Sequence, residues 1–106
     1  MPEEGFSHAV AHKASPDQIV IMAAVQRPIS VKCIYEKAPA PAWRSKKSWF
    51  LIAEEDRMIL PETQRFMAER MGATTRSNHA DHTPMYTAPN LVVDVVLEAT
   101  REANRN

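Results

Sequence analysis

The sequence predicts an α/β fold with a parallel sheet, and two observations carry this prediction. From residue 48 onward, the expected elements follow the order strand, loop, helix, strand, loop, helix, which is the alternation of α/β proteins. The first strand, at 48–53, is a nearly continuous apolar run, as is typical of a parallel strand buried on both faces. Two parallel strands leave two edges without partners, so we expect an incomplete sheet whose other strands lie elsewhere.

Residues 1–37 are expected to form a helical subdomain, although 1–14 show only a weak pattern. A helix begins at Ser15, which can cap it, while Pro16 suits the first helical position and Gln18 completes a capping box. Its apolar residues, 19–25, face most directions. This helix therefore needs cover from another part of the molecule.

A proline-rich linker is predicted at 38–47, after one or two helical turns at 31–36. Alanine and proline alternate at the start of this linker, and each residue before a proline is pushed toward extended geometry. The linker separates the helical subdomain, 1–37, from the sheet-containing segment, 48–106.

The helix after the first strand is predicted to begin at Pro61 and to continue to Met71. Its spacing places Phe66 and Met67 inward. Gly72 is the expected stop, because glycine readily adopts the left-handed conformation that ends helices.

A second short strand is expected at 73–77, followed by a polar loop. Pro89 then begins the last helix. Apolar residues recur along it at helical spacing, and these are Leu91, Val92, Val95, Val96, Ala99 and Ala103.

The composition excludes several classes of protein. Thirteen basic and thirteen acidic residues give a formal charge of zero, which argues against a nucleic-acid partner. Cys33 is the one cysteine, so an intrachain disulfide framework cannot form. Gly5 and Gly72 are the two glycines, and their separation excludes a glycine-rich phosphate loop and a Gly-x-Ser-x-Gly elbow.

No membrane or targeting segment is expected. The N-terminus is acidic, whereas a signal peptide begins with positive charge. The longest apolar run, 19–25, is far shorter than the roughly 20 residues that cross a bilayer. We therefore expect a cytoplasmic protein without a membrane partner.

Candidate chemistry lies where the two strands end. Asp56 follows the first strand, and His82 follows the second. The carboxyl ends of neighbouring parallel strands meet at one edge of a sheet, where functional groups gather. A carboxylate there can hold an imidazole in one tautomer and stabilise its protonated form, as a general base requires.

These residues carry a resemblance to a known family. The segment SWFLIAEEDRMILP at 48–61 resembles the acid-bearing strand and loop of the α/β-hydrolase superfamily. Residues 64–74 are similar to the helix and strand start that follow in that family. His82, with Pro89 seven residues later, looks like its catalytic histidine. Residues 15–43 are similar to the end of the helical cap in the esterase and haloperoxidase-like branch.

The resemblance implies the C-terminal part of an α/β-hydrolase, with Asp56 as the acid and His82 as the base of a Ser-Asp-His triad. Such enzymes hydrolyse ester-type acyl bonds of small molecules without a cofactor. The chain departs from the family in lacking the nucleophile elbow and the oxyanion loop, and in placing Asp81 where a small residue is common. We therefore expect little activity alone, and either an N-terminal hydrolase segment or a second copy as partner.

Other residues compete for the two roles. Glu54 and Glu55 flank Asp56 as alternative acids, although solvated loop charges are their simpler interpretation. His79 is an alternative to His82, which is preferred for its spacing to the last helix.

A metal site is a further alternative. It would combine His79, Asp81 and His82 with His8 and His12, which lie four residues apart and would share a face if their segment were helical.

The cysteine and the two tryptophans are expected to have structural roles. Cys33 lies among apolar residues, so we expect inert packing, with a thiol nucleophile as the alternative. Trp43 and Trp49 are expected as core anchors.

A non-catalytic role for the whole chain also stays open. The apolar helix and the open strand edges would suit an oligomerising or interaction module from a truncated or split gene.

Overall fold

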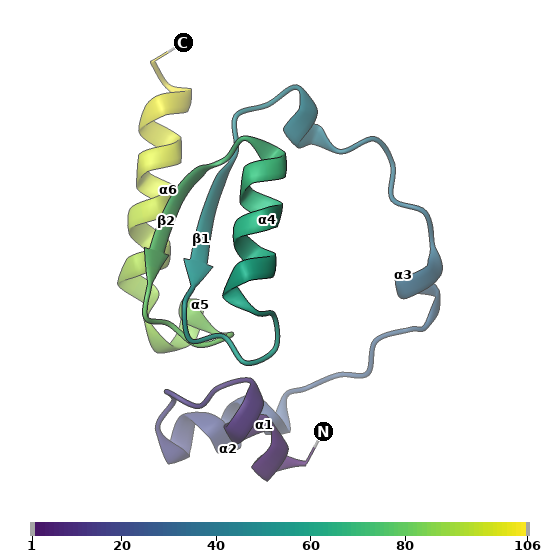
Figure 1. The fold of residues 1–106 in the computed structure, drawn as a ribbon. Coiled ribbons are helices and arrows are strands. Elements are labelled where there is room, and N and C mark those ends of the chain that lie inside the picture. Colours follow the sequence, from purple (N-terminus) through teal and green to yellow (C-terminus); the bar gives the residue numbers. More distant parts are fainter. Residues whose placement is uncertain (1, 106) are drawn as a thin grey trace.

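The computed structural model describes residues 2–105 and contains a helical N-terminal part followed by a small sheet with helices on both faces (Figure 1). The elements are α1 (Glu3–Ala9), α2 (Pro16–Ala24), α3 (Lys32–Tyr35), the 3-10 turn η1 (Ala42–Arg44), β1 (Trp49–Ala53), α4 (Pro61–Met71), β2 (Thr74–Asn78), α5 (Pro84–Thr87) and α6 (Pro89–Ala103).

The sheet pairs β1 and β2 in parallel, in a register that runs from Trp49 opposite Thr74 to Ala53 opposite Asn78. Alternate side chains of a strand point to opposite faces. Accordingly, Ile52 lies beside α4, and Leu51 lies beside α6. The chain is thus an α/β protein, with the strand and helix order that its sequence predicts.

Burial along the strands is less complete than expected. Ile52 and Ala53 are buried, whereas the first three residues of β1 are half-buried and β2 is exposed along its whole length. The second strand begins at Thr74, one residue later than predicted. All five of its residues, Thr74–Asn78, are polar and exposed. The prediction of a strand buried on both faces therefore holds only for the C-terminal end of β1.

Helix α4 has the predicted bounds but a different inward face. Gln64 and Ala68 are buried, Met67 is half-buried, and Phe66 is 62% exposed. The placement of Phe66 inward was therefore wrong. A polar residue occupies the core because Gln64 satisfies its own amide group: its oxygen accepts the Ala53 N–H at 2.9 Å, and its Nε2 donates to the Ile59 carbonyl at 2.8 Å.

Two of the helix ends confirm specific sequence features. Gly72 ends α4 with a φ of 61°, the left-handed conformation that glycine adopts without a steric penalty. At the start of α2, the Ser15 hydroxyl accepts the Gln18 N–H at 3.3 Å, and the Gln18 side chain accepts the Ser15 N–H at 2.9 Å. The predicted capping box is therefore formed.

The N-terminal part has a small core of its own, in which Phe6 of α1, Met22 of α2 and Ala11 between them are buried. Helix α1 was not predicted, because Glu3–Ala9 lacks a clear apolar stripe. These two helices lie beyond the C-terminal ends of the strands (Figure 1). The Arg57 guanidinium fixes part of this position by donating to the His8 carbonyl at 2.8 Å.

An extended arm connects α2 to β1 and swings away from both (Figure 1). Every residue from 25 to 40 is exposed, including the apolar Ile34 and Tyr35. Cys33 is exposed as well, so the expectation that it packs inertly among apolar residues was wrong. Apolar neighbours in sequence cannot bury one another when their segment lacks a surface to pack on.

Among residues 2–105, none of the helices combines the length and apolar character that crossing a bilayer requires.

Candidate active site

Asp56 and His82 are brought together by the ends of β1 and β2. The His82 Nδ1 atom lies 2.9 Å from Asp56 Oδ2 and 3.1 Å from Oδ1. The Asp56 side chain is 6% exposed, and that of His82 is 34% exposed. The predicted juxtaposition at one edge of the sheet is present, with the carboxylate behind and the imidazole at the surface of a cavity.

The turn after β1 fixes the Asp56 carboxylate. Its Oδ1 accepts the backbone N–H groups of Met58 at 2.8 Å and Ile59 at 3.0 Å, which forms an Asx-type turn. Its Oδ2 accepts a hydrogen bond from Gln64 Nε2 at 3.1 Å. These donors come from the loop and from α4. They fix the orientation of the carboxylate independently of its contact with His82.

The same contacts keep Asp56 ionised. Burial is the largest single influence and raises the pKa of the Asp56 carboxyl group. The hydrogen bonds from Ile59, His82 and Met58 together outweigh burial, so this pKa lies below the usual range for aspartate. The group is therefore a carboxylate at neutral pH.

An ionised carboxylate can only accept hydrogen bonds, and this determines the His82 tautomer. Because Nδ1 faces Asp56, the proton of a neutral imidazole belongs on Nδ1. The lone pair is then on Nε2. This arrangement leaves the outer ring nitrogen able to take up a proton, while Asp56 stabilises the imidazolium that results.

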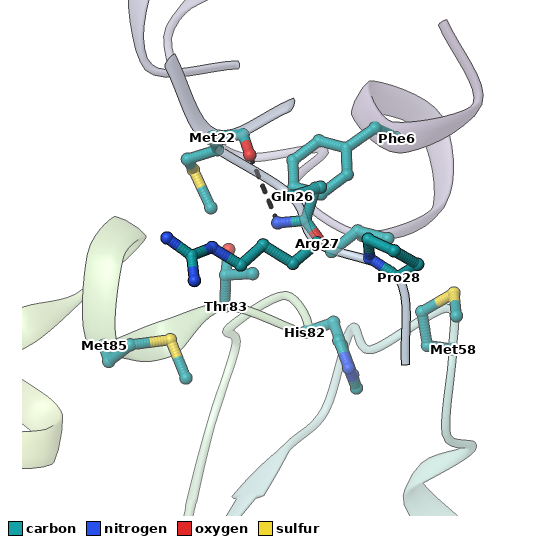
Figure 2. Close-up of a pocket in the computed structure, with 10 residues that line it drawn as sticks. Phe6, Met22, Gln26, Arg27, Pro28, Met58, His82, Thr83 and Met85 are labelled. Carbon is teal, nitrogen blue, oxygen red and sulfur yellow. Dashed lines mark hydrogen bonds between the residues drawn. The ribbon is translucent and has the colours of Figure 1, made fainter. Parts of the chain in front are cut away.

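A cavity of about 670 Å³ lies between the N-terminal helices and the strand-end loops (Figure 2). Its lining residues are Phe6, Val10, Met22, Gln26, Arg27, Pro28, Met58, His82, Thr83 and Met85. Figure 2 shows the residues of α1, α2 and the segment after α2 on one side, and His82, Met58 and Met85 on the other. This volume lies within the range of small-molecule sites, and the lining is predominantly apolar.

Asp81 holds the histidine loop, a role that the sequence reasoning missed. Its side chain has 0% exposure. Its Oδ1 accepts from the Thr83 N–H at 2.9 Å, the Thr83 hydroxyl at 3.1 Å and the Thr87 hydroxyl at 2.7 Å. Its Oδ2 accepts the Lys13 N–H at 3.0 Å. The threonines two and six residues after Asp81 were the available signal.

The Asp81 contacts join the N-terminal part to the residue next to His82. Burial is again the largest influence and raises the pKa of Asp81, but hydrogen bonds from Thr87, Thr83 and Lys13 outweigh it. The net pKa is lowered, so this buried group is a carboxylate too. Its charge is compensated by donors rather than by a neighbouring cation.

Glu54, one of the competing acids, contacts β2 and α4 instead of the histidine loop. It accepts the Ser77 hydroxyl and pairs with Arg65 of α4. The hydrogen bond from Ser77, followed by that from Arg65, lowers the pKa of Glu54. Glu54 thus joins the strand ends to α4 and does not contact His82.

Glu55 and His79 form a separate group. Glu55 pairs with Lys13, whose Nζ also donates to the His79 carbonyl at 2.7 Å. The hydrogen bond from Lys13 is the main cause that lowers the pKa of Glu55. His79 Nδ1 lies 3.7 Å from Glu55, but its side chain is 83% exposed. His79 is therefore outside the cavity that His82 lines.

The metal alternative has less support. His8 lies on α1 and His12 in the turn that follows it. Within the described part of the chain, no three His, Cys, Asp or Glu side chains converge on a common point.

Comparisons with known proteins add no family to this picture. A scan against models of protein families finds no match, and a search of the curated proteins finds none either.

Proposed function

We propose that this chain supplies the acid and the general base of a Ser-His-Asp triad that hydrolyses ester-type acyl bonds, as in α/β-hydrolases. One observation carries the proposal: Asp56 and His82 are hydrogen-bonded at 2.9 Å where two neighbouring parallel strands end. The order of acid and histidine in the sequence, and the resemblance of 48–61 to the acid-bearing strand of that family, support the same assignment.

The roles follow from the tautomer. His82 Nε2 takes the proton of a serine hydroxyl while the serine oxygen attacks the acyl carbon, and Asp56 stabilises the imidazolium. The imidazolium then gives this proton to the departing alcohol oxygen, which leaves an acyl-serine. Water repeats the sequence: Nε2 removes a proton from water, the hydroxyl oxygen attacks, and the serine recovers its proton as the acid departs.

The nucleophile and the oxyanion donors have to come from another polypeptide segment. The 106 residues contain no Gly-x-Ser-x-Gly. In the proposal, the second segment presents its serine to Nε2 at the cavity. The apolar lining of this cavity, with Met22, Met58 and Met85, suits the hydrocarbon part of an ester.

A fluorophosphonate probe tests the proposal, because it reacts with a serine whose hydroxyl is activated by a neighbouring base. The chain is tagged in cells that naturally contain it and purified under non-denaturing conditions with its associated polypeptides. We expect labelling of a serine in the purified material, and a fall of at least about 10³-fold in the labelling rate for His82→Ala.

The matched control is His79→Ala, which removes an exposed imidazole three residues away and should leave labelling unchanged. The chain alone should hydrolyse short-chain aryl esters no faster than its His82→Ala variant. The proposal is wrong if no serine is labelled, or if labelling is indifferent to His82.

A second candidate, a non-catalytic oligomerising or interaction module, is favoured by the exposed arm and by the unpaired edges of the two-stranded sheet. A stable homo-oligomer that contains no labelled serine would favour this module over the hydrolase.

A further inference from the structure

A second site candidate lies at the end of the sheet away from Asp56 and His82. An open groove of about 440 Å³ runs between the linker, the start of β1 and the end of α4. Its apolar lining comprises Ala38, Pro39, Pro41, Trp43, Phe50, Met67 and Met71. In Figure 1 this end of β1 lies far from α1 and α2, so the groove is separate from the proposed active site.

The guanidinium groups of two arginines lie near the half-buried Trp43 ring at this groove. The guanidinium carbon of Arg44 lies 5.6 Å from the ring centroid, and that of Arg70 lies 5.7 Å from it. Both distances are within the range of cation–π contacts. Two positive charges, one on η1 and one on α4, therefore lie beside the same indole ring at the border of an apolar surface.

Neither arginine forms an ion pair with any residue in the range 2–105. The surrounding sequence adds to the positive charge: residues 37–53 contain Lys37, Arg44, Lys46 and Lys47 and no acidic residue. The protein as a whole has a formal charge of zero. Lys47 pairs with Glu102, but the lining of the groove itself holds two arginines, apolar residues and no acidic side chain.

We propose that this groove binds a small apolar carboxylate, with its hydrocarbon part against Phe50 and the methionines and its carboxylate at the guanidinium groups of Arg44 and Arg70. A guanidinium matches a carboxylate with two parallel N–H donors, and an aromatic ring on its other side keeps it in place. The volume lies within the range of small-molecule sites. This binding is independent of the proposed hydrolysis, because it uses no residue of the other cavity.

Octanoate is the probe, and octanamide is its uncharged counterpart of the same length. The measurement is made in a Trp49→Phe background, where Trp43 is the one remaining tryptophan and reports the groove through its fluorescence. We expect saturable binding of octanoate that weakens with added salt, because screening reduces the attraction between exposed charges. Octanamide and acetate should bind at least about fivefold more weakly, since each lacks one of the two features.

Arg70→Gln and Arg44→Gln should each weaken octanoate binding by about fivefold. Arg101→Gln is the matched control, because Arg101 is an exposed arginine on α6 outside the groove. Far-ultraviolet circular dichroism checks that each variant is folded. If one of the two groove variants fails to fold, the other one tests the proposal. The inference is overturned if octanoate fails to saturate, if octanamide binds equally well, or if the groove variants behave like Arg101→Gln.

Discussion

Asp56 and Asp81 are two buried carboxylates that the same loops hold in different ways. The Asp56 carboxylate accepts hydrogen bonds from the Met58 and Ile59 N–H groups and from Gln64. It also faces the His82 imidazole. Asp81 contacts only structural donors, among them the Lys13 N–H of the N-terminal part. The first is thus suited to chemistry, and the second to positioning the residue beside it.

Asp81→Asn should lower the free energy of unfolding at pH 7 by about 1–3 kcal/mol, because an amide cannot accept from all four donors. Urea titration followed by tryptophan fluorescence measures the difference. Asp94→Asn, an exposed aspartate on α6, is the matched control and should change stability by less than about 0.5 kcal/mol.

The same variant should change how stability depends on pH. The pKa of Asp81 is lower in the folded chain than the value of about 3.9 in the unfolded chain. Its contribution is therefore fully present above the unfolded pKa and is lost as pH falls through the folded pKa. Below pH 5, the free energy of unfolding should fall less steeply in Asp81→Asn than in the wild type. An unchanged slope would contradict the assignment of Asp81 as a buried carboxylate.

At the scale of elements, α4 shows where sequence patterns succeed and where they fail. Its start at Pro61 and its end at Gly72 follow from local backbone preferences, which a sequence reveals directly. Its inward face depends on Gln64, whose amide is satisfied by the turn after β1. That compensation is tertiary, so hydrophobic periodicity placed Phe66 inward instead.

In the candidate site, too, some features follow from local sequence and others depend on tertiary contacts. The juxtaposition of Asp56 and His82 could be predicted, because each follows a recognisable strand and parallel strands end at one edge. The threonines at 83 and 87 indicate that Asp81 holds its own loop, but its contact with Lys13, 68 residues away in sequence, could not be predicted. Helix α1 also escaped prediction, because Phe6 is its one buried residue and gives no periodic pattern.

The orientation of α4 can be tested by a pair of substitutions. Ala68→Leu should lower the free energy of unfolding by about 1–3 kcal/mol, because Ala68 is buried and the larger side chain overfills its site. Phe66→Ala should change it by no more than about 0.5 kcal/mol, since that ring is exposed. Urea titration compares the two. A loss of about 3–5 kcal/mol for Phe66→Ala would mean that the ring belongs to the core after all.

At the scale of the whole molecule, the chain exposes more surface than a compact protein of its size. Its accessible area is 8026 Å², about 2,000 Å² more than the roughly 6,000 Å² expected for a folded monomer of 12.0 kDa. Its radius of gyration is 15.6 Å, against about 13 Å for a compact domain of this length. The excess is more than twice the roughly 800 Å² that each partner buries in a standard interface.

Purified alone, the chain should therefore associate with itself at micromolar concentration. The exposed apolar residues of the arm and of α6, such as Ile34, Tyr35 and Val96, and the open strand edges provide the surface. Sedimentation velocity measures this directly. A compact 12.0 kDa monomer that unfolds cooperatively would show instead that the fold is sufficient by itself.

The central claim is that Asp56 holds His82 so that its Nε2 is a free base, and the tautomer of His82 tests it most directly. Histidine labelled with ¹⁵N is measured by magic-angle-spinning NMR at pH 8, which tolerates self-association, and His82→Ala identifies the resonances. We expect the His82 ring proton on Nδ1, and a loss of that preference in Asp56→Asn, while His79 is unchanged. A proton on Nε2, or a His82 tautomer equilibrium unaffected by Asp56→Asn, would contradict the claim.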